Sequence, residues 1–202
     1  GIDPNTNQAK VEYSNKPGEE GTGESEEVVA KVYTFEFGIY KFSLKNDTAA
    51  ADDEKNRNPL ANAQFKLYAD AEHTSEIKLV EESGKVYRQA KDTTETAVDY
   101  IETDATGKVT IKGLKEGTYY LAETKAPAGF NKLVGDIKVE IGNLVYDTTD
   151  TTKLNSYDVT YTMPGKTSGT TVKVEESVPK AEIPVLNKAG SILPSTGGMG
   201  TV

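Results

Sequence analysis

The strongest constraint on the fold is a period-two alternation of apolar residues that recurs in many short runs. Such alternation places every second side chain on one face, which is typical of strands with one buried face. Polar turn clusters, for example residues 104–107 and 164–166, separate the runs. The pattern therefore predicts an all-β sandwich of two packed sheets. The runs are Phe35, Phe37 and Ile39; Phe65 and Leu67; Val109 and Ile111; Tyr119 and Leu121; Ile137, Val139 and Ile141; Tyr157, Val159 and Tyr161; and Ile183 and Val185.

Composition excludes several classes of function. The 202 residues hold 36% hydrophobic residues, enough for a thin sandwich core. Cys is absent, which excludes thiolate zinc sites, cysteine nucleophiles, iron–sulfur clusters and disulfides. The single His73 lies in a polar stretch and predicts no catalytic site. The net charge of 23 − 32 = −9 excludes a nucleic-acid partner. We expect neither an enzyme of conventional turnover nor a cofactor, a metal or a small-molecule substrate.

Three segments are expected along the chain. Residues 1–28 hold one candidate strand, at 10–15, followed by an acidic, Gly-rich stretch. They are interpreted as the terminal strand of a preceding domain plus a linker, with a flexible tail as the alternative. Residues 29–190 form the sandwich, and residues 191–202 form an exposed terminal segment.

Three of the alternating runs lead to a polar residue that keeps the apolar phase. Lys41 continues the run from Phe35, Glu123 follows Leu121, and Asn187 follows Val185. A side chain in this phase must point into the core or lie at its edge. An isolated buried charge costs several kcal/mol unless it is neutralised or paired. The three residues are therefore expected to meet.

Two arrangements satisfy such a group. One is a buried Lys–Glu ion pair with Asn filling a hydrogen-bonding gap. The other is a covalent amide between the Lys amine and the Asn side chain. Desolvation lowers the pKa of a Lys and supplies the neutral amine that attacks. A protonated Glu carboxyl can polarise the Asn carbonyl and shuttle protons while ammonia leaves.

Three motifs resemble Gram-positive pilins assembled by sortases. The sequence YYLAETKAPAGF at 119–130 is similar to their E-box, and PLANAQFKLY at 59–68 resembles a segment of Cna B-type domains. The third motif is similar to the sorting signal that sortases read, and it consists of Leu193, Pro194, Ser195, Thr196 and Gly197. The motifs stand in the order found in the C-terminal domain of a backbone (major) pilin.

The resemblance implies a Cna B-type, inverse immunoglobulin-like β-sandwich with an intradomain Lys–Asn isopeptide bond catalysed by the E-box Glu. These roles fall on Lys41, Asn187 and Glu123, with Lys45 as an alternative Lys, since its segment also resembles the family's. Lys41 is preferred because Phe42 and Leu44 change the apolar phase and would turn Lys45 outward.

The resemblance also implies a function and partners. Sortase would cleave after Thr196 and join it to a Lys of another pilin subunit or to peptidoglycan. The chain would then be a structural shaft subunit of an extracellular, cell wall-anchored pilus. The alternatives are the stalk domain of a monomeric wall-anchored adhesin and, less favoured, an accessory domain of a wall-anchored enzyme.

Four further features lie outside these motifs. Residues 157–163 and 170–178 are expected to form an extra hairpin. The acidic residues within 47–54 lack the ligand spacing of a calcium site and are interpreted as a solvated loop. Lys180 follows a proline, as in a pilin motif, but lies too close to the last strand. Asn15, at the end of its candidate strand, is a candidate for a bond within a preceding domain.

Overall fold

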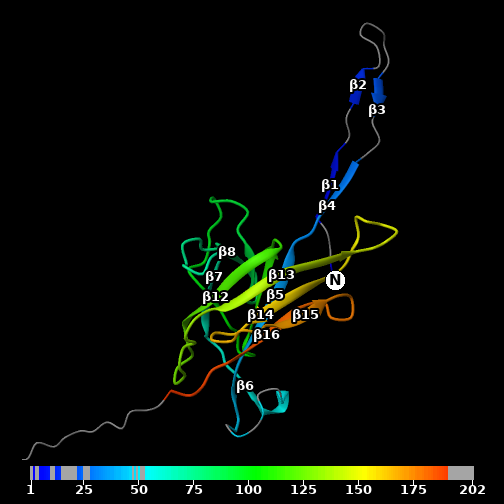
Figure 1. Cartoon of the computed structure of the whole chain (residues 1–202). Coiled ribbons are helices and arrows are strands. Elements are labelled where there is room, and N and C mark those ends of the chain that lie inside the picture. Colours follow the sequence, from blue (N-terminus) through cyan, green and yellow to red (C-terminus); the bar gives the residue numbers. More distant parts are fainter. Residues whose placement is uncertain are drawn as a thin grey trace, which may run out of the picture.

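The computed structural model describes residues 2, 5–9, 12–14, 22–24, 28–46, 48, 50 and 53–190. These residues build a sandwich of two β-sheets, as the alternation predicts (Figure 1). The first sheet has the strand order β10 (Ile101–Glu102), β7 (Gln64–Tyr68), β12 (Gly117–Lys125), β13 (Ile137–Tyr146), β14 (Leu154–Thr162), β15 (Thr170–Val174). The second has the order β16 (Ala181–Leu186), β5 (Phe35–Leu44), β11 (Lys108–Leu114), β9 (Val86–Gln89), β8 (Leu79–Ser83), with β6 (Arg57–Pro59) also on β5 and a short 3-10 helix, η1 (Glu54–Asn56), before it.

The core lies between the two sheets and is filled by the predicted alternating residues. Along β13, for example, Ile137, Val139 and Ile141 are buried while the residues between them are only partly covered. The extra hairpin is also confirmed, since β14 pairs antiparallel with β15. The strands β8 and β9 were not predicted, because neither shows an apolar alternation: most side chains of β8, the edge strand, face solvent, and the short β9 beside it buries only Tyr87.

The first and last strands of the sandwich lie side by side. β16 pairs parallel with β5, so that Val185 stands opposite Lys41 and Leu186 opposite Phe42. Both strands therefore run in the same direction and end at the same end of the sandwich. This pairing brings together residues that lie near the two ends of the domain in sequence.

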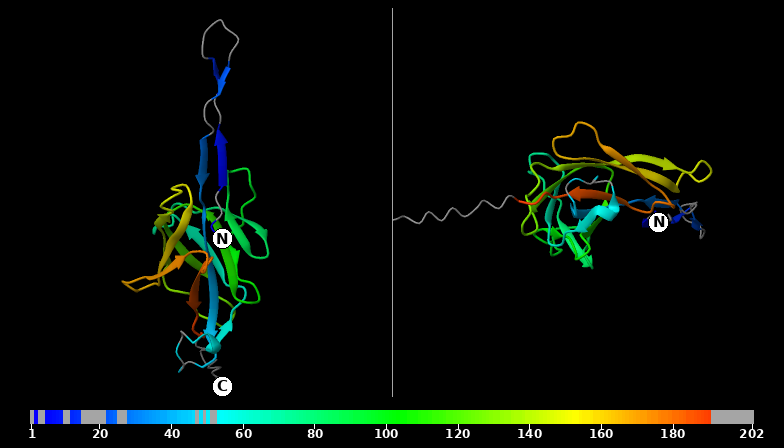
Figure 2. Two further views of the ribbon diagram at one scale, coloured as in Figure 1. Left: turned by 90° about the vertical axis from the view of Figure 1, so that its right-hand side faces the viewer. Right: turned by 90° about the horizontal axis from the view of Figure 1, so that it is seen from below.

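A two-stranded ribbon precedes β5. β1 (Asn5–Ala9) pairs antiparallel with β4 (Val28–Val32), and β2 (Glu12–Ser14) pairs with β3 (Thr22–Glu24). Figure 2 shows the ribbon projecting from the sandwich in line with β5. The expectation of a single strand at 10–15 is thus wrong in its detail, because the acidic stretch after it supplies a pairing partner. The assignment of 1–28 to a preceding domain stays a prediction, and Asn15 lies outside the described residues.

A tyrosine fixes the junction between this ribbon and the sandwich. The hydroxyl of Tyr33 donates to the carbonyl of Thr152 at 2.8 Å and accepts from the backbone N–H of Leu154 at 2.9 Å. Its ring meets that of Tyr146 edge to face at 6.2 Å. The turn between β13 and β14 therefore holds Tyr33, and with it the chain, at the start of β5.

Within the described ranges no helix is long and apolar enough to cross a membrane.

Candidate functional site

Lys41 is held by backbone contacts on both sides of its peptide unit. Its N–H donates to the carbonyl of Gly107 at 2.7 Å, and its carbonyl accepts from the N–H of Leu60 at 2.9 Å. Gly107 has a φ of +75°, and a Cβ there would lie 2.3 Å from the Lys41 carbonyl oxygen. Only glycine fits this approach of two backbones. The predicted turn at 104–107 thus fixes the strand that carries Lys41.

Glu123 projects from the facing sheet, on β12. The pairing of β12 with β7 is regular up to Glu123, opposite Phe65, and then shifts before Lys125. Such a bulge ends regular pairing and often lies beside a functional site. Glu123 itself keeps the phase of Leu121 and is 4% exposed.

Asn187 follows directly after β16. Its N–H donates to the carbonyl of Phe42 at 2.9 Å, which extends the ladder with β5 by one residue. Its side chain continues the inward phase of Ile183 and Val185 and is 2% exposed. The residue therefore enters the core from the same sheet as Lys41, while Glu123 approaches from the opposite sheet.

The structure brings these three predicted residues into mutual contact. Lys41 Nζ lies 3.0 Å from Glu123 Oε1 and hydrogen-bonds to Asn187 Oδ1. Asn187 Nδ2 donates to the same Glu123 Oε1 at 3.1 Å. The side chains of Lys41 and Glu123 have no exposed surface. One carboxylate oxygen thus stands between an amine and the nitrogen of a carboxamide, in a site closed to water.

Burial changes the proton affinity of the amine. Desolvation lowers the pKa of Lys41 from 10.5 to about 8, against the attraction and hydrogen bond of Glu123, which raise it. The ring of Phe65, whose centre lies 5.7 Å from Lys41 Nζ, adds a cation–π attraction to the ammonium, but the net shift of the pKa is downward. A neutral amine is therefore far more accessible at Lys41 than at an exposed lysine.

Two contacts of the site could not be predicted. The backbone N–H of Leu133 donates to Glu123 Oε2 at 2.7 Å, and the carbonyl of Gly107 accepts from Lys41. Both are backbone groups, which every residue carries, so the sequence pattern holds no signal for them. Phe65 belongs to a predicted alternating run, and its inward position could have suggested its place below Lys41.

Lys45, the alternative lysine, lies away from this group. Its side chain is exposed, and Nζ donates to the carbonyl of Lys55 at 2.9 Å. Phe42 is buried and Leu44 half-buried, but Ser43 between them is buried as well, so the expected change of phase after Lys41 is not a simple one. Lys45 nevertheless lies on the surface, and of the two lysines only Lys41 reaches the group.

A second Lys–Glu–amide group provides an internal comparison. Glu102 accepts from Lys85 Nζ at 3.3 Å and from Gln64 Nε2 at 3.2 Å. Here the Lys and Glu side chains are 32% and 23% exposed. Desolvation lowers the pKa of Lys85 less than the contacts with Glu102 and its neighbours raise it, so the net shift is upward. A Lys beside a Glu and an amide therefore stays charged when water reaches the group, and a charged amine is not a nucleophile.

The other predicted features hold no competing site in the described part of the chain. His73 pairs with Asp136 at 2.6 Å and stacks on Tyr68 at a protein surface. Asp53 caps the short 3-10 helix, whereas Asp47 and Asp52 lie outside the described residues. No cluster of three or more acidic or His side chains there could hold a metal ion. The sorting motif, residues 193–197, also lies outside the described residues.

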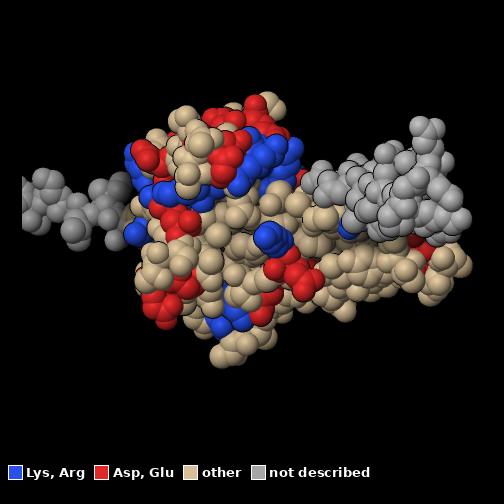
Figure 3. Space-filling model, turned by 90° about the horizontal axis from the view of Figure 1, so that it is seen from above, with Lys and Arg blue, Asp and Glu red and all other residues tan. Residues whose placement is uncertain are grey.

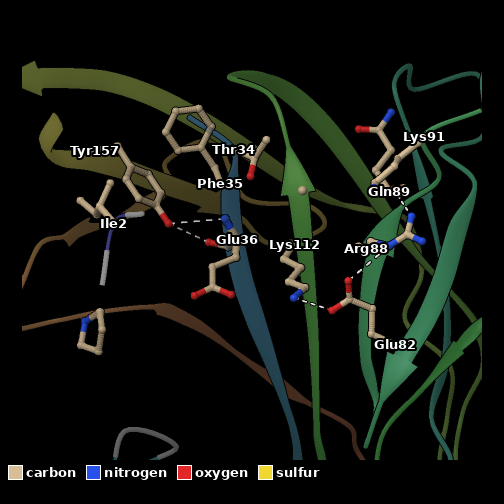
Figure 4. A pocket seen from close by; sticks show the side chains of 12 residues that line it. Ile2, Thr34, Phe35, Glu36, Glu82, Arg88, Gln89, Lys91, Lys112 and Tyr157 are labelled. Carbon is tan, nitrogen blue, oxygen red and sulfur yellow. Dashed lines mark hydrogen bonds and ion pairs between the residues drawn. The ribbon is translucent and has the colours of Figure 1, made fainter. Parts of the chain in front are cut away.

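A cavity of about 500 Å³ lies where the chain enters β5. Figure 4 shows the Tyr157 hydroxyl bound to the backbone of Glu36, and Glu82 between Lys112 and Arg88. These charged groups pair with one another, and the Lys112 and Glu82 side chains are 40% and 35% exposed, so water reaches them, unlike Lys41 and Glu123. Figure 3 shows acidic and basic side chains interspersed on the face seen there, without a large field of one sign.

Comparison with known proteins assigns the fold family. Residues 46–156, which are 111 of the 202 residues, match the family described as SpaA, prealbumin-like fold domain. The chain belongs to the SpaA prealbumin-like fold family. The matched range of this SpaA-type chain includes Glu123, whereas Lys41 and Asn187 lie on either side of it. A search of curated proteins gave no match.

Several solved structures are similar to the SpaA-type chain. The minor pilin GBS52 of Streptococcus agalactiae is 19% identical, with a TM-score of 0.43, over 86% of this chain and 55% of that one. The group B streptococcus pilus 2b backbone protein is 22% identical, with a TM-score of 0.45, over 84% and 48%. BcpA, the major pilin subunit of Bacillus cereus, is 19% identical, with a TM-score of 0.42, over 93% and 39%. The chain thus spans about half the length of these pilins or less.

Proposed function

We propose that the chain is a structural shaft subunit of a covalently polymerised, extracellular pilus. In this proposal an isopeptide bond between Lys41 and Asn187 forms within the domain without an external enzyme, and Glu123 catalyses it. The bond is made once and the chain is not a turnover enzyme. The supporting observation is the water-free contact of an amine, a carboxylate and a carboxamide between the first and last strands of the sandwich.

The geometry suggests how the protons move. Glu123 Oε1 takes a proton from the Lys41 ammonium, which lies 3.0 Å away. The neutral amine attacks Cγ of Asn187 and forms a tetrahedral intermediate. The same carboxyl oxygen, 3.1 Å from Nδ2, returns the proton to the departing nitrogen. The new C–N bond replaces the old one, and Lys41 ammonium plus Asn187 carboxamide become an amide plus ammonium, so that atoms and charge balance.

This route requires one proton shared between Lys41 and Glu123. When both groups are protonated, no base is present to free the amine. When neither is protonated, no acid is present for the leaving nitrogen. Because the pKa of Lys41 is lowered to about 8, the shared proton is lost above about that pH. The rate of bond formation should therefore be bell-shaped in pH, with its upper limb near pH 8.

A shaft subunit needs a cross-link that survives outside the cell. The chain has no Cys and cannot form a disulfide. A Lys41–Asn187 amide would replace it and would resist reduction. Because β5 and β16 lie side by side, the bond would pass a pull from the first strand directly to the last.

The sorting motif supports the polymerisation part of the proposal. Sortase would cleave between Thr196 and Gly197 and transfer Thr196 to a Lys amine of another subunit, or to peptidoglycan for wall anchoring. The alternative, a stalk domain of a monomeric wall-anchored adhesin, uses the same sandwich and motif. Native material that runs as a high-mass ladder on a denaturing gel would support the shaft subunit, whereas a single band would support the stalk.

Intact mass tests the bond directly. The purified chain should weigh less than its sequence by one ammonia, about 17 Da, and a peptide joined through Lys41 and Asn187 should appear after digestion. Glu123→Ala should restore the full mass. An unshifted mass of the unsubstituted chain would refute the isopeptide proposal.

A further inference from the structure

The two oxygens of Glu123 have different neighbours. Oε1 faces both reacting groups, Lys41 Nζ and Asn187 Nδ2. Oε2 accepts the N–H of Leu133 at 2.7 Å. A carboxylate on a flexible side chain can rotate about its last torsion, and a bond to one oxygen fixes where the other one lies. The Leu133 N–H therefore determines the position of the oxygen that would carry the proton.

The loop that carries this N–H also holds the end of the described chain. Asn131 N–H donates to the carbonyl of Lys188 at 3.0 Å, and Gly190 N–H donates to the carbonyl of Gly129 at 2.8 Å. Phe130 and Ala189 form a β-bridge between these two contacts. The residues that follow Asn187 are thus paired with the loop whose next turn supports Glu123.

The loop is anchored on the site rather than free beside it. Leu133 packs against the core, whereas the next side chain, Val134, is 93% exposed. At Leu133 the loop is therefore held twice, by the packing of the side chain against the core and by the hydrogen bond of the N–H to Glu123.

We propose that the backbone N–H of Leu133 is a positioning group for the Lys41–Asn187 bond. The loop around residues 129–133 pairs with residues 188–190, sets Leu133 over Glu123 and so places Oε1 between the amine and the carboxamide. Bond formation is then coupled to the docking of the segment after the last strand. This inference rests on the proposed isopeptide bond and adds to it a backbone donor outside the three reacting residues.

Removing this donor should alter the pH profile of bond formation as well as its rate. An N–H at Oε2 stabilises the charged carboxylate. Without it more of the negative charge of the carboxylate is directed at the Lys41 ammonium, whose pKa the carboxylate already raises against desolvation. The upper limb of the bell-shaped profile, which follows Lys41, should therefore move to higher pH. A loop that only closes the domain would change the rate without moving this limb.

The test compares Leu133→Pro, which removes the N–H, with Leu133→Ala and Val134→Pro, which keep it. Each chain is made by brief cell-free translation, transferred to buffers across neutral and alkaline pH, and sampled by intact mass. Leu133→Pro should lose ammonia about ten- to a hundredfold more slowly than the parent, with the upper limb shifted to higher pH. Val134→Pro should follow the profile of the parent chain, and Leu133→Ala, which loses side-chain packing but keeps the N–H, should leave the upper limb where it lies in the parent.

The outcomes separate this inference from the proposal beneath it. A parent chain that never loses ammonia refutes the isopeptide bond itself. A parent that reacts while Leu133→Pro reacts equally fast, or more slowly with an unmoved upper limb, refutes the positioning role. If Leu133→Pro does not fold, the hydroxy-acid analogue of leucine at position 133 replaces only the N–H by an ester oxygen. In that chain, the rate of ammonia loss and the pH of the upper limb then decide whether the N–H has the positioning role.

Discussion

The size of the stabilisation by the cross-link can be worked out from the chain that it closes. Lys41 and Asn187 are 146 residues apart. The chain-entropy relation for cross-links gives about 5 kcal/mol for a loop of this length. For a chain of this size, 1 kcal/mol shifts the melting temperature by about 2–4 °C, so loss of the bond should lower it by about 10–20 °C.

The variant Lys41→Met with Glu123→Gln removes the amine and the carboxylate without leaving a buried charge. Met and Gln are close in volume to the residues they replace, so packing should change by less than about 1.5 kcal/mol. Replacing a buried ion pair by matched neutral groups is often neutral in stability. The fall in melting temperature should therefore report the missing cross-link.

The assay is a calorimetric melt with intact mass measured on the same samples. Glu123→Gln alone is the matched control, because it blocks the bond but keeps the buried amine. The double variant should melt well below the parent and at or above the single variant. If the double variant melts within a few degrees of a parent shown to carry the bond, the entropy argument for the cross-link is wrong.

Three further predictions follow from the site and its surroundings. Lys45→Arg should keep the mass deficit of one ammonia and Lys41→Arg should abolish it, and the reverse result in peptide mapping would transfer the bond to Lys45. In Asn187→Ala, which cannot form the bond, the folded chain gives up the Lys41 proton near pH 8 and the unfolded chain near 10.5. Its free energy of unfolding should therefore rise from pH 8 to 10.5 relative to Lys41→Met with Glu123→Gln, and a flat difference in urea titrations would contradict the lowered pKa. The paired contacts with the Arg88 guanidinium, at 2.6 and 2.8 Å, help to lower the pKa of Glu95 from 4.5 to about 2. That stabilisation is present above pH 4.5 and is lost as the pH falls toward 2, so the stability gap between the parent and Glu95→Gln should close over this range in acid melts.

Side-chain phase made much of the site predictable. Lys41, Glu123 and Asn187 each continue an apolar alternation, and in a sandwich that phase leads to one core. The parallel pairing of β5 with β16 does not follow from phase, because alternation says which face a residue takes and not which strand lies next to it. The preference for Lys41 over Lys45 rested on the same reasoning and agrees with the exposed position of Lys45.

The contacts that sequence could not predict are those of the backbone. The Leu133 N–H and the Gly107 carbonyl reach the site through the path of loops, which depends on the whole fold. Edge strands such as β8 could not be predicted, because the side chains of an exposed strand show no apolar alternation. The pairing within the ribbon of β1 to β4 could not be predicted for a related reason. Two strands can pair without burying a face, and such strands need no apolar alternation.

The side-by-side ends of β5 and β16 have a consequence for length. A domain that unfolds under tension releases the chain between its anchoring points, here 146 residues. At about 3.3–3.6 Å per extended residue, this amounts to roughly 500 Å of slack from one domain. With Lys41 joined to Asn187 that chain is a closed loop outside the line of force and none of it can be drawn out. A filament of such domains would hold its length under load, and a pull at its tip would reach its base undamped.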